Sequence, residues 1–380
     1  MNRIVLVIGW MCALSLNVNA QQKPNKKEVL EVMERANAYF MNHWPDPGHT
    51  ITTTKTRPSN IWTRGVYYEG LMALLSVETN KQEKKKYLDY AISWGDKHKW
   101  GLNTGNKTRN ADNQCAGQTY YDLYVLTGRK NDYMLDSIKE SLGRMLATNK
   151  VDDWSWIDAI QMGMPLFVEL GLEFKDTNYL HRAYEMYSYT KHVHGGKGLL
   201  NSADNLWWRD KDFVPPYKEP NGKDCYWSRG NGWVLAALVR VLDKLPKTDS
   251  HYEEYLTDYK AMCKALLPLQ REDGYWNVSL KDPSNFGGKE LTGTSLFVYG
   301  FAYGINNHLL PADEYAPALY KAWNAVTKEC VHPNGFLGWV QGTGKEPKDG
   351  QPLGYDKTPD FEDYGLGCFL LAGSEVYKLK

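Results

Sequence analysis

Two kinds of helical segment alternate along residues 21–380, and this alternation constrains the fold more than any other feature. One kind is heavily charged and comprises residues 25–43, 81–99, 131–150, 176–194, 249–271 and 311–330. The other is nearly free of charge, is rich in glycine and alanine, and comprises residues 62–77, 112–127, 156–170, 230–242, 292–305 and 363–377. The period of about 60 residues is longer than that of common solenoid repeats.

A helix that is apolar all round is buried, whereas a helix with a polar face lies outside. Six buried helices that alternate with six half-exposed ones therefore predict an all-α (α/α)6 toroid, a single domain over residues 21–380. An open solenoid would need polar caps at both ends, yet the last segment, with Phe369 and Leu370, is as apolar as the middle ones. We also expect the inner helices to approach closely at Gly163, Gly232, Gly300 and Gly367.

The first twenty residues have the pattern of a signal peptide. Arg3 gives a basic start, residues 4–16 form an apolar run, and small side chains precede a cleavage site after Ala20. The apolar run is too short to span a bilayer. We therefore expect an exported protein, either periplasmic or secreted.

Composition restricts the partners. The formal net charge is +0 and no basic cluster stands out, which argues against nucleic acid or a membrane surface as a partner. The 14 tryptophans and 26 tyrosines are numerous for such a chain and indicate carbohydrate, because aromatic faces stack on sugar rings. The five cysteines that follow the signal peptide are widely spaced, so we expect free buried thiols without a metal site. We expect a monomer or a weak dimer.

All inner helices of such a ring run the same way, so their N-termini gather at one mouth. The residues at these starts are Trp62, Arg64, Asp112, Asn113, Gln114, Trp156, Asp158, Arg229, Asn231, Trp233, Thr292, Thr294, Asp363 and Tyr364. Helix N-termini carry partial positive charge, which suits an anionic ligand.

Two aspartates at this mouth have both a structural and a catalytic interpretation. Ser155 and Asp158 have the spacing of a capping box, and Asp112 fits a simple N-cap. Taken together, the two aspartates favour paired acid and base chemistry. Arg229 begins an almost uncharged helix and opposes its dipole, so we expect an anionic partner, either a ligand or an aspartate. Arg209 is followed by Asp210, which could simply pair with it.

Several motifs along the chain occur together in one group of enzymes. They are Ala111-Asp112-Asn113-Gln114 with Gly117-Gln118, Trp156-Ile157-Asp158-Ala159 with Met162, Trp207-Trp208-Arg209-Asp210, Trp227-Ser228-Arg229-Gly230-Asn231-Gly232-Trp233, Leu291-Thr292-Gly293-Thr294, and Leu370-Leu371-Ala372-Gly373-Ser374-Glu375. With them the chain resembles the unsaturated rhamnogalacturonyl and glucuronyl hydrolases of glycoside hydrolase family 105, which are related to family 88. That family has the (α/α)6 fold.

The resemblance implies a reaction that the residues alone do not disclose. Polysaccharide lyases leave a 4,5-unsaturated uronic acid at the non-reducing end of their products, and these hydrolases remove it by hydrating the C4=C5 bond. An acid protonates C4, water adds at C5, and the resulting hemiketal opens and releases the next sugar. No cofactor or metal is implied. The parent polysaccharide stays open between rhamnogalacturonan, another pectin, a glucuronate-containing glycan and ulvan.

The resemblance also implies roles for single residues. Asp158 matches the general acid/base, Asp112 matches the second aspartate, and Arg229 and Trp233 match positions that line the uronate pocket. The other substrate contacts that we expect are Trp62, Arg64, Gln118, Trp156, Met162, Trp208, Arg209 and Thr294. The chain departs from the family at Arg209, where some members carry histidine, and at Asn113, where aspartate is frequent. The first departure bears on the leaving sugar more than on the chemistry.

Two other functions fit the same barrel. A sugar epimerase would need histidines as its acid and base, and the predicted inner-helix starts have none. A non-catalytic oligosaccharide-binding protein would use the same aromatic mouth but would not need paired aspartates.

Overall fold

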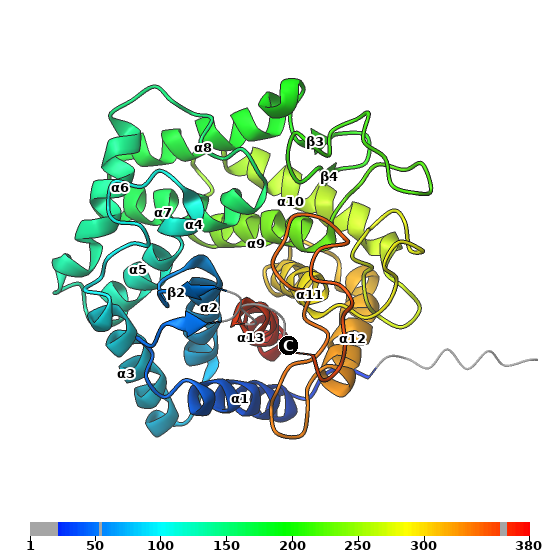
Figure 1. Ribbon diagram of the computed structural model, residues 1–380, viewed down its shortest axis with the longest axis horizontal. Coiled ribbons are helices and arrows are strands. Elements are labelled where there is room, and N and C mark those ends of the chain that lie inside the picture. Colours follow the sequence, from blue (N-terminus) through cyan, green and yellow to red (C-terminus); the bar gives the residue numbers. More distant parts are fainter. Residues whose placement is uncertain (1–21, 53–54, 358–362) are drawn as a thin grey trace, which may run out of the picture.

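The computed structural model describes residues 22–52, 55–357 and 363–380, so the expected signal peptide lies outside it. Helices with one polar face form the outside of the molecule (Figure 1). They are α1 (Lys26–His43), α3 (Lys81–Lys97), α6 (Asp136–Leu146), α8 (Thr177–His192), α10 (Tyr252–Leu266) and α12 (Ala312–Glu329). Asparagine or aspartate caps α1, α3 and α8 through side-chain bonds to free backbone N–H groups.

The inner positions are taken by helices in which most residues are buried. These helices are α2 (Trp62–Val77), α4 (Ala111–Gln114) with α5 (Ala116–Leu126), α7 (Asp158–Phe174), α9 (Ser228–Lys244), α11 (Leu291–Asn306) and α13 (Asp363–Lys378). The segment expected as one helix over 112–127 is divided at Cys115. Within the described ranges, the alternation of inner and outer helices agrees with the predicted order.

The inner helices form a closed ring. Each packs against its neighbours in the chain's order, and the last, α13, packs against the first, α2. This closure confirms the (α/α)6 toroid and excludes the open solenoid. Closure depends on a close approach at Gly367 of α13, where an added Cβ would lie 2.2 Å from the Val66 carbonyl oxygen. Gly300 of α11 similarly faces Leu235 of α9, at 2.4 Å from an ideal Cβ.

The remaining elements are short and connect the helices. They are the hairpin β1 (Ile51–Thr52) with β2 (Thr56–Arg57), the hairpin β3 (Leu200–Asn201) with β4 (Leu206–Trp207), and the 3-10 turns η1 (Asp132–Leu135), η2 (His194–Gly196) and η3 (Leu267–Leu269). The five cysteines from Cys115 onward are free and buried, as predicted. Among the helices described, none has the length and hydropathy to cross a membrane.

Candidate active site

The N-terminal ends of the inner helices meet at one mouth of the ring. Trp62 at the start of α2 lies with its ring centroid 5.2 Å from that of Tyr364 on α13 and 6.4 Å from that of Trp233 on α9. Asp112 of α4 lies close enough to Asp158 of α7 for the charge of Asp158 to raise the pKa of Asp112. The expected gathering of these helix starts is therefore observed.

Neither aspartate serves as the cap that its sequence context allows. The N-cap of α4 is Asn110, whose side chain accepts a hydrogen bond from the Asn113 N–H. The N-cap of α7 is Ile157, and its helix start has no side-chain cap bond. The capping box of Ser155 with Asp158 is thus absent. Both carboxyls are free for another role at the mouth.

Arg209 interacts with both aspartates: it donates a hydrogen bond to Asp158, and its charge acts on Asp112. Its Nε donates to the Asp158 carboxylate at 3.1 Å, and its Nη1 donates to Asp210 at 2.8 Å. The segment that carries Arg209 is held against the start of α7, because Ile157 N–H donates to the Arg209 carbonyl and Trp156 forms a bridge with Asp210. Sequence reasoning considered Asp210 as the partner of Arg209, and the structure adds Asp158.

The two aspartates have different surroundings. Burial, and after it the charge of Asp158, raise the pKa of Asp112 to about 7 against the opposing charge of Arg209. Asp158 instead accepts a charge-assisted hydrogen bond from the Arg209 guanidinium. Near neutral pH Asp112 can therefore hold a proton at this site.

Among the residues that the structure describes, Arg229 does not pair with an aspartate, and an anionic ligand as its partner stays a prediction. Its guanidinium is buried between the rings of Trp227 and Tyr364 and donates to the backbone carbonyls of Gln341 and Gly342 at 2.7 and 2.8 Å. Arg229 thus holds the loop at 341–342 against the mouth. Gln341 could not be predicted from the sequence as a partner of Arg229. Its backbone carbonyl accepts the hydrogen bond, and every residue has such a carbonyl.

The other expected substrate contacts divide into two sets. Trp62 and Trp156 are partly exposed at the mouth, and Trp208 is buried beside it with the Lys197 ammonium 5.2 Å from its ring. The remaining four side chains, Arg64, Gln118, Met162 and Thr294, are buried among the helices. Arg64 pairs with Asp363 at 2.5 Å, Gln118 donates to the Gln161 carbonyl, and Thr294 accepts from Trp276 N–H. Substrate contact by any of these residues stays a prediction.

Within the part of the chain that the structure describes, no group of three or more histidine, cysteine, aspartate or glutamate side chains is placed to hold a metal ion.

The chain resembles known hydrolases over nearly its whole length. The model of Glycosyl Hydrolase Family 88 matches residues 32–380. An unsaturated 3S-rhamnoglycuronyl hydrolase from Formosa agariphila is 31% identical over 97% of this chain and 95% of its own. A solved glycosyl hydrolase of family 88 from Bacteroides vulgatus is 32% identical, with a TM-score of 0.82 over 94% of this chain and 100% of that one.

Two further structures extend this comparison. One described as a polysaccharide lyase is 29% identical, with a TM-score of 0.81 over 93% of this chain and 97% of that one. A possible member of family 105 from Salmonella enterica is 19% identical, with a TM-score of 0.71 over 94% of this chain and 95% of that one, and shares the fold. These findings confirm the expected resemblance. The chain belongs to glycosyl hydrolase family 88 and is a glycoside hydrolase.

Proposed function

We propose that this enzyme removes a 4,5-unsaturated uronic acid from the non-reducing end of lyase-generated oligosaccharides by hydrating the C4=C5 bond. The observation that carries the proposal is the placement of Asp112, Asp158 and Arg209 together at the mouth formed by the inner-helix N-termini. A cation and helix dipoles attract a uronate, and two carboxyls can move the proton that hydration requires. The names of the relatives agree with this reaction.

Asp158 is the proposed general acid and base, and Asp112 is the proposed store of its proton. In the free enzyme Asp158 accepts a hydrogen bond from the Arg209 guanidinium, and Asp112, whose pKa is raised to about 7, holds the proton. An incoming uronate carboxylate competes for Arg209, which allows Asp158 to receive the proton and deliver it to C4. Asp158, again a carboxylate, then accepts a proton from the water that adds at C5. The hemiketal opens and the next sugar leaves.

The rate should depend on pH through Asp112. Because its pKa is raised to about 7, Asp112 loses its proton as pH rises through that value, and kcat/KM should fall there. Arg209 lowers this pKa by its charge, so Arg209→Ala should move the alkaline limb of the residual activity to higher pH. A pH profile measured on both proteins checks this shift. If the alkaline limb of the pH profile lay at the same pH in Arg209→Ala and in the wild type, that limb could not report the titration of Asp112.

Arg229→Lys should bind substrate poorly although it keeps the positive charge. The lysine ammonium cannot reproduce two planar N–H groups that reach two separate carbonyls, so the 341–342 loop loses its anchor. We expect KM for the unsaturated uronide to rise by about tenfold or more, which corresponds to loss of a charged hydrogen bond. Steady-state kinetics measures this change. An unchanged KM would count against a role for Arg229 in shaping the uronate pocket.

The proposed leaving sugar is rhamnose with a 3-sulfate. The support is that two relatives are unsaturated 3S-rhamnoglycuronyl hydrolases, together with the position of the Lys197 ammonium beside Trp208 near the mouth. Oligosaccharides from rhamnogalacturonan and other pectins are the alternative substrates. Paired assays on sulfated and desulfated forms of one unsaturated uronyl-rhamnose disaccharide decide between them. Equal kcat/KM values for the sulfated and the desulfated disaccharide would show that the enzyme does not recognise the sulfate.

A polysaccharide lyase is the second candidate, because one similar structure is so described. A lyase creates the C4=C5 bond, whereas the proposed hydrolase consumes it. The ultraviolet absorbance of the unsaturated uronate therefore rises with a lyase and falls with the hydrolase. One time course on intact polysaccharide and another on its lyase digest separate the two functions.

We also propose that the enzyme is exported to the periplasm or secreted, and acts there as a monomer or weak dimer. The pattern of Arg3, the apolar run and Ala20 supports export. Mass spectrometry of the native protein should find Gln21 at its N-terminus. Retention of Met1 would contradict cleavage.

A further inference from the structure

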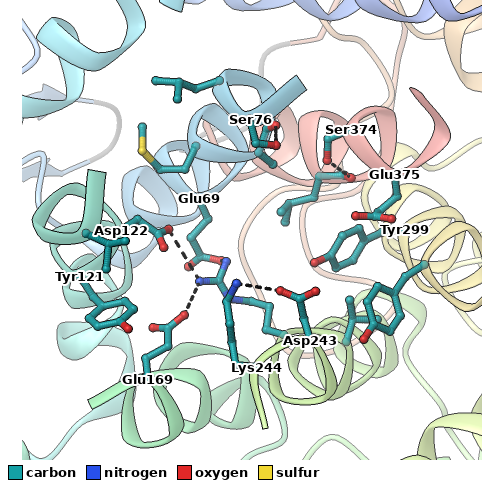
Figure 2. A pocket seen from close by; sticks show the side chains of 18 of the residues that line it. Glu69, Ser76, Tyr121, Asp122, Glu169, Asp243, Lys244, Tyr299, Ser374 and Glu375 are labelled. Carbon is teal, nitrogen blue, oxygen red and sulfur yellow. Dashed lines mark hydrogen bonds and ion pairs between the residues drawn. The ribbon is translucent and has the colours of Figure 1, made fainter. Parts of the chain in front are cut away.

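A cavity of about 480 Å³ opens at the other mouth of the ring, opposite the candidate active site. The C-terminal halves of all the inner helices line it (Figure 2). One lining residue from each, in ring order from α2 to α13, is Glu69, Asp122, Glu169, Arg240, Tyr299 and Glu375.

The interior of this cavity has more negative than positive side chains. Three carboxyls surround the single guanidinium of Arg240: its nitrogens lie 3.3 Å from Glu169, 3.7 Å from Glu69 and 4.0 Å from Asp122. Figure 2 shows these three carboxylates pointing toward one another from α2, α5 and α7. The other cations that line the cavity are already paired, Lys244 with Asp243, Lys378 with Glu375 and Arg129 with Glu173.

One carboxylate oxygen in this interior lacks a partner. Glu169 is 2% exposed, and its Oε2 accepts no hydrogen bond, while its Oε1 faces Arg240. Glu69 differs, since its oxygens accept from Gln161 and Cys115. A buried carboxylate oxygen without a donor is costly, so the Glu169 position is suited to a donor from outside the chain.

Burial favours the protonated forms of the carboxyls in this cavity. Burial raises the pKa of Glu69 to about 7 and that of Glu169 to about 8, and it also raises the pKa of Asp122. The Arg240 charge opposes each rise without cancelling it. A bound cation would stabilise the ionised carboxylates in place of these protons.

The surroundings define the class of cation. The C-termini of the inner helices add partial negative charge, which repels uronates and favours cations. The described residues offer no cluster suited to a metal ion. Tyr299 and Tyr303 supply aromatic walls that attract organic ammonium groups, and the volume lies in the range of small-molecule sites. We propose that this cavity binds a small organic cation with primary ammonium groups, one of which donates to Glu169 and Asp122.

The test uses 1,4-diaminobutane as the probe and the full-length mature protein at pH 8 and low ionic strength. Titration calorimetry should show saturable binding at one site. Glu169→Gln should weaken it by about tenfold or more, because the amide keeps the shape but removes the charged acceptor. Glu31→Gln, which removes the same charge from the exposed face of α1, should bind like the wild type.

Folding of each variant is checked by circular dichroism, and Asp122→Asn provides a second interior variant with the same expected loss. Absence of saturable binding to the wild type would overturn the proposal. Equal affinities of Glu169→Gln and Glu31→Gln would overturn it as well, since binding would then lie elsewhere. Because the readout is binding, the result does not depend on whether the proposed hydrolase reaction is correct.

A second readout is the pH dependence of affinity. The groups that face Glu169 are Glu69 on α2, Asp122 on α5, and Arg240 and Lys244 on α9. A cation that displaces protons from these carboxyls must bind more tightly as pH rises from about 6 to about 8. The wild type should show this gain and Glu169→Gln should lose most of it. Affinity that is independent of pH in the wild type would contradict binding at these carboxyls.

Discussion

Asp158→Asn should abolish turnover while the fold stays intact. The amide keeps the size of the side chain but cannot deliver a proton to C4 of the substrate. Loss of a general acid lowers the rate by at least about 10²–10⁴. Because Asp158 provides no helix cap, its replacement removes no capping bond. The measurement is kcat on an unsaturated uronide, with circular dichroism to show that the variant is folded.

A matched control separates the catalytic loss from a general effect of replacing aspartate. Asp176 stands at the start of the outer helix α8, where its side chain accepts from the Asn178 N–H. Asn is an equally good cap, so Asp176→Asn should keep both stability and activity. A folded Asp158→Asn enzyme with nearly normal kcat would exclude Asp158 as the acid.

Gly367→Ala should destabilise the protein strongly, because it opens the ring where its last inner helix meets its first. An alanine Cβ would lie 2.2 Å from the Val66 carbonyl oxygen and 2.6 Å from its carbonyl carbon. These are backbone atoms of α2, so no side chain can turn aside to relieve the overlap. Overpacking of this kind costs about 1–3 kcal/mol and occasionally more. Denaturant unfolding of the two proteins measures the difference.

Gly143→Ala is the control for this prediction. Gly143 lies within the outer helix α6, and an added Cβ there has no neighbour within 4 Å. Alanine has the better helix propensity by about 1 kcal/mol, so this variant should be slightly more stable than the wild type. If Gly367→Ala were as stable as Gly143→Ala, the close packing of α2 against α13 would not hold the ring together.

The fold could be predicted because buried and half-exposed helices differ in their content of charged residues, and this difference repeats along the sequence. Inner helices avoid charge over most of their length and outer helices display it, so the order of the elements follows from composition alone. The break at Cys115 could not be predicted in this way, because neither proline nor a charged residue stands next to Cys115 in the sequence.

The candidate site was predictable only in part. Parallel inner helices place Asp112 and Asp158 at one mouth, which follows from the topology. The ion pair of Asp158 with Arg209 does not, because Arg209 lies in a connection whose path depends on the bridge between Trp156 and Asp210. The sequence-based prediction placed a site only at the starts of the inner helices, so it did not include the cavity at the opposite mouth. Glu69 and Glu169 are isolated charges in apolar segments, and only the ring closure brings them together around Arg240.

The most direct test of the proposed function is the fate of the proton in heavy water. Hydration of the C4=C5 bond requires protonation of C4, which ordinary glycosidases do not perform, because their carboxyls act at the anomeric carbon. The released keto sugar should therefore carry deuterium at C4, as nuclear magnetic resonance can show, and saturated glucuronides and galacturonides should be inert. Rapid cleavage of a saturated uronide without deuterium at C4 would show that the enzyme is a conventional glycosidase.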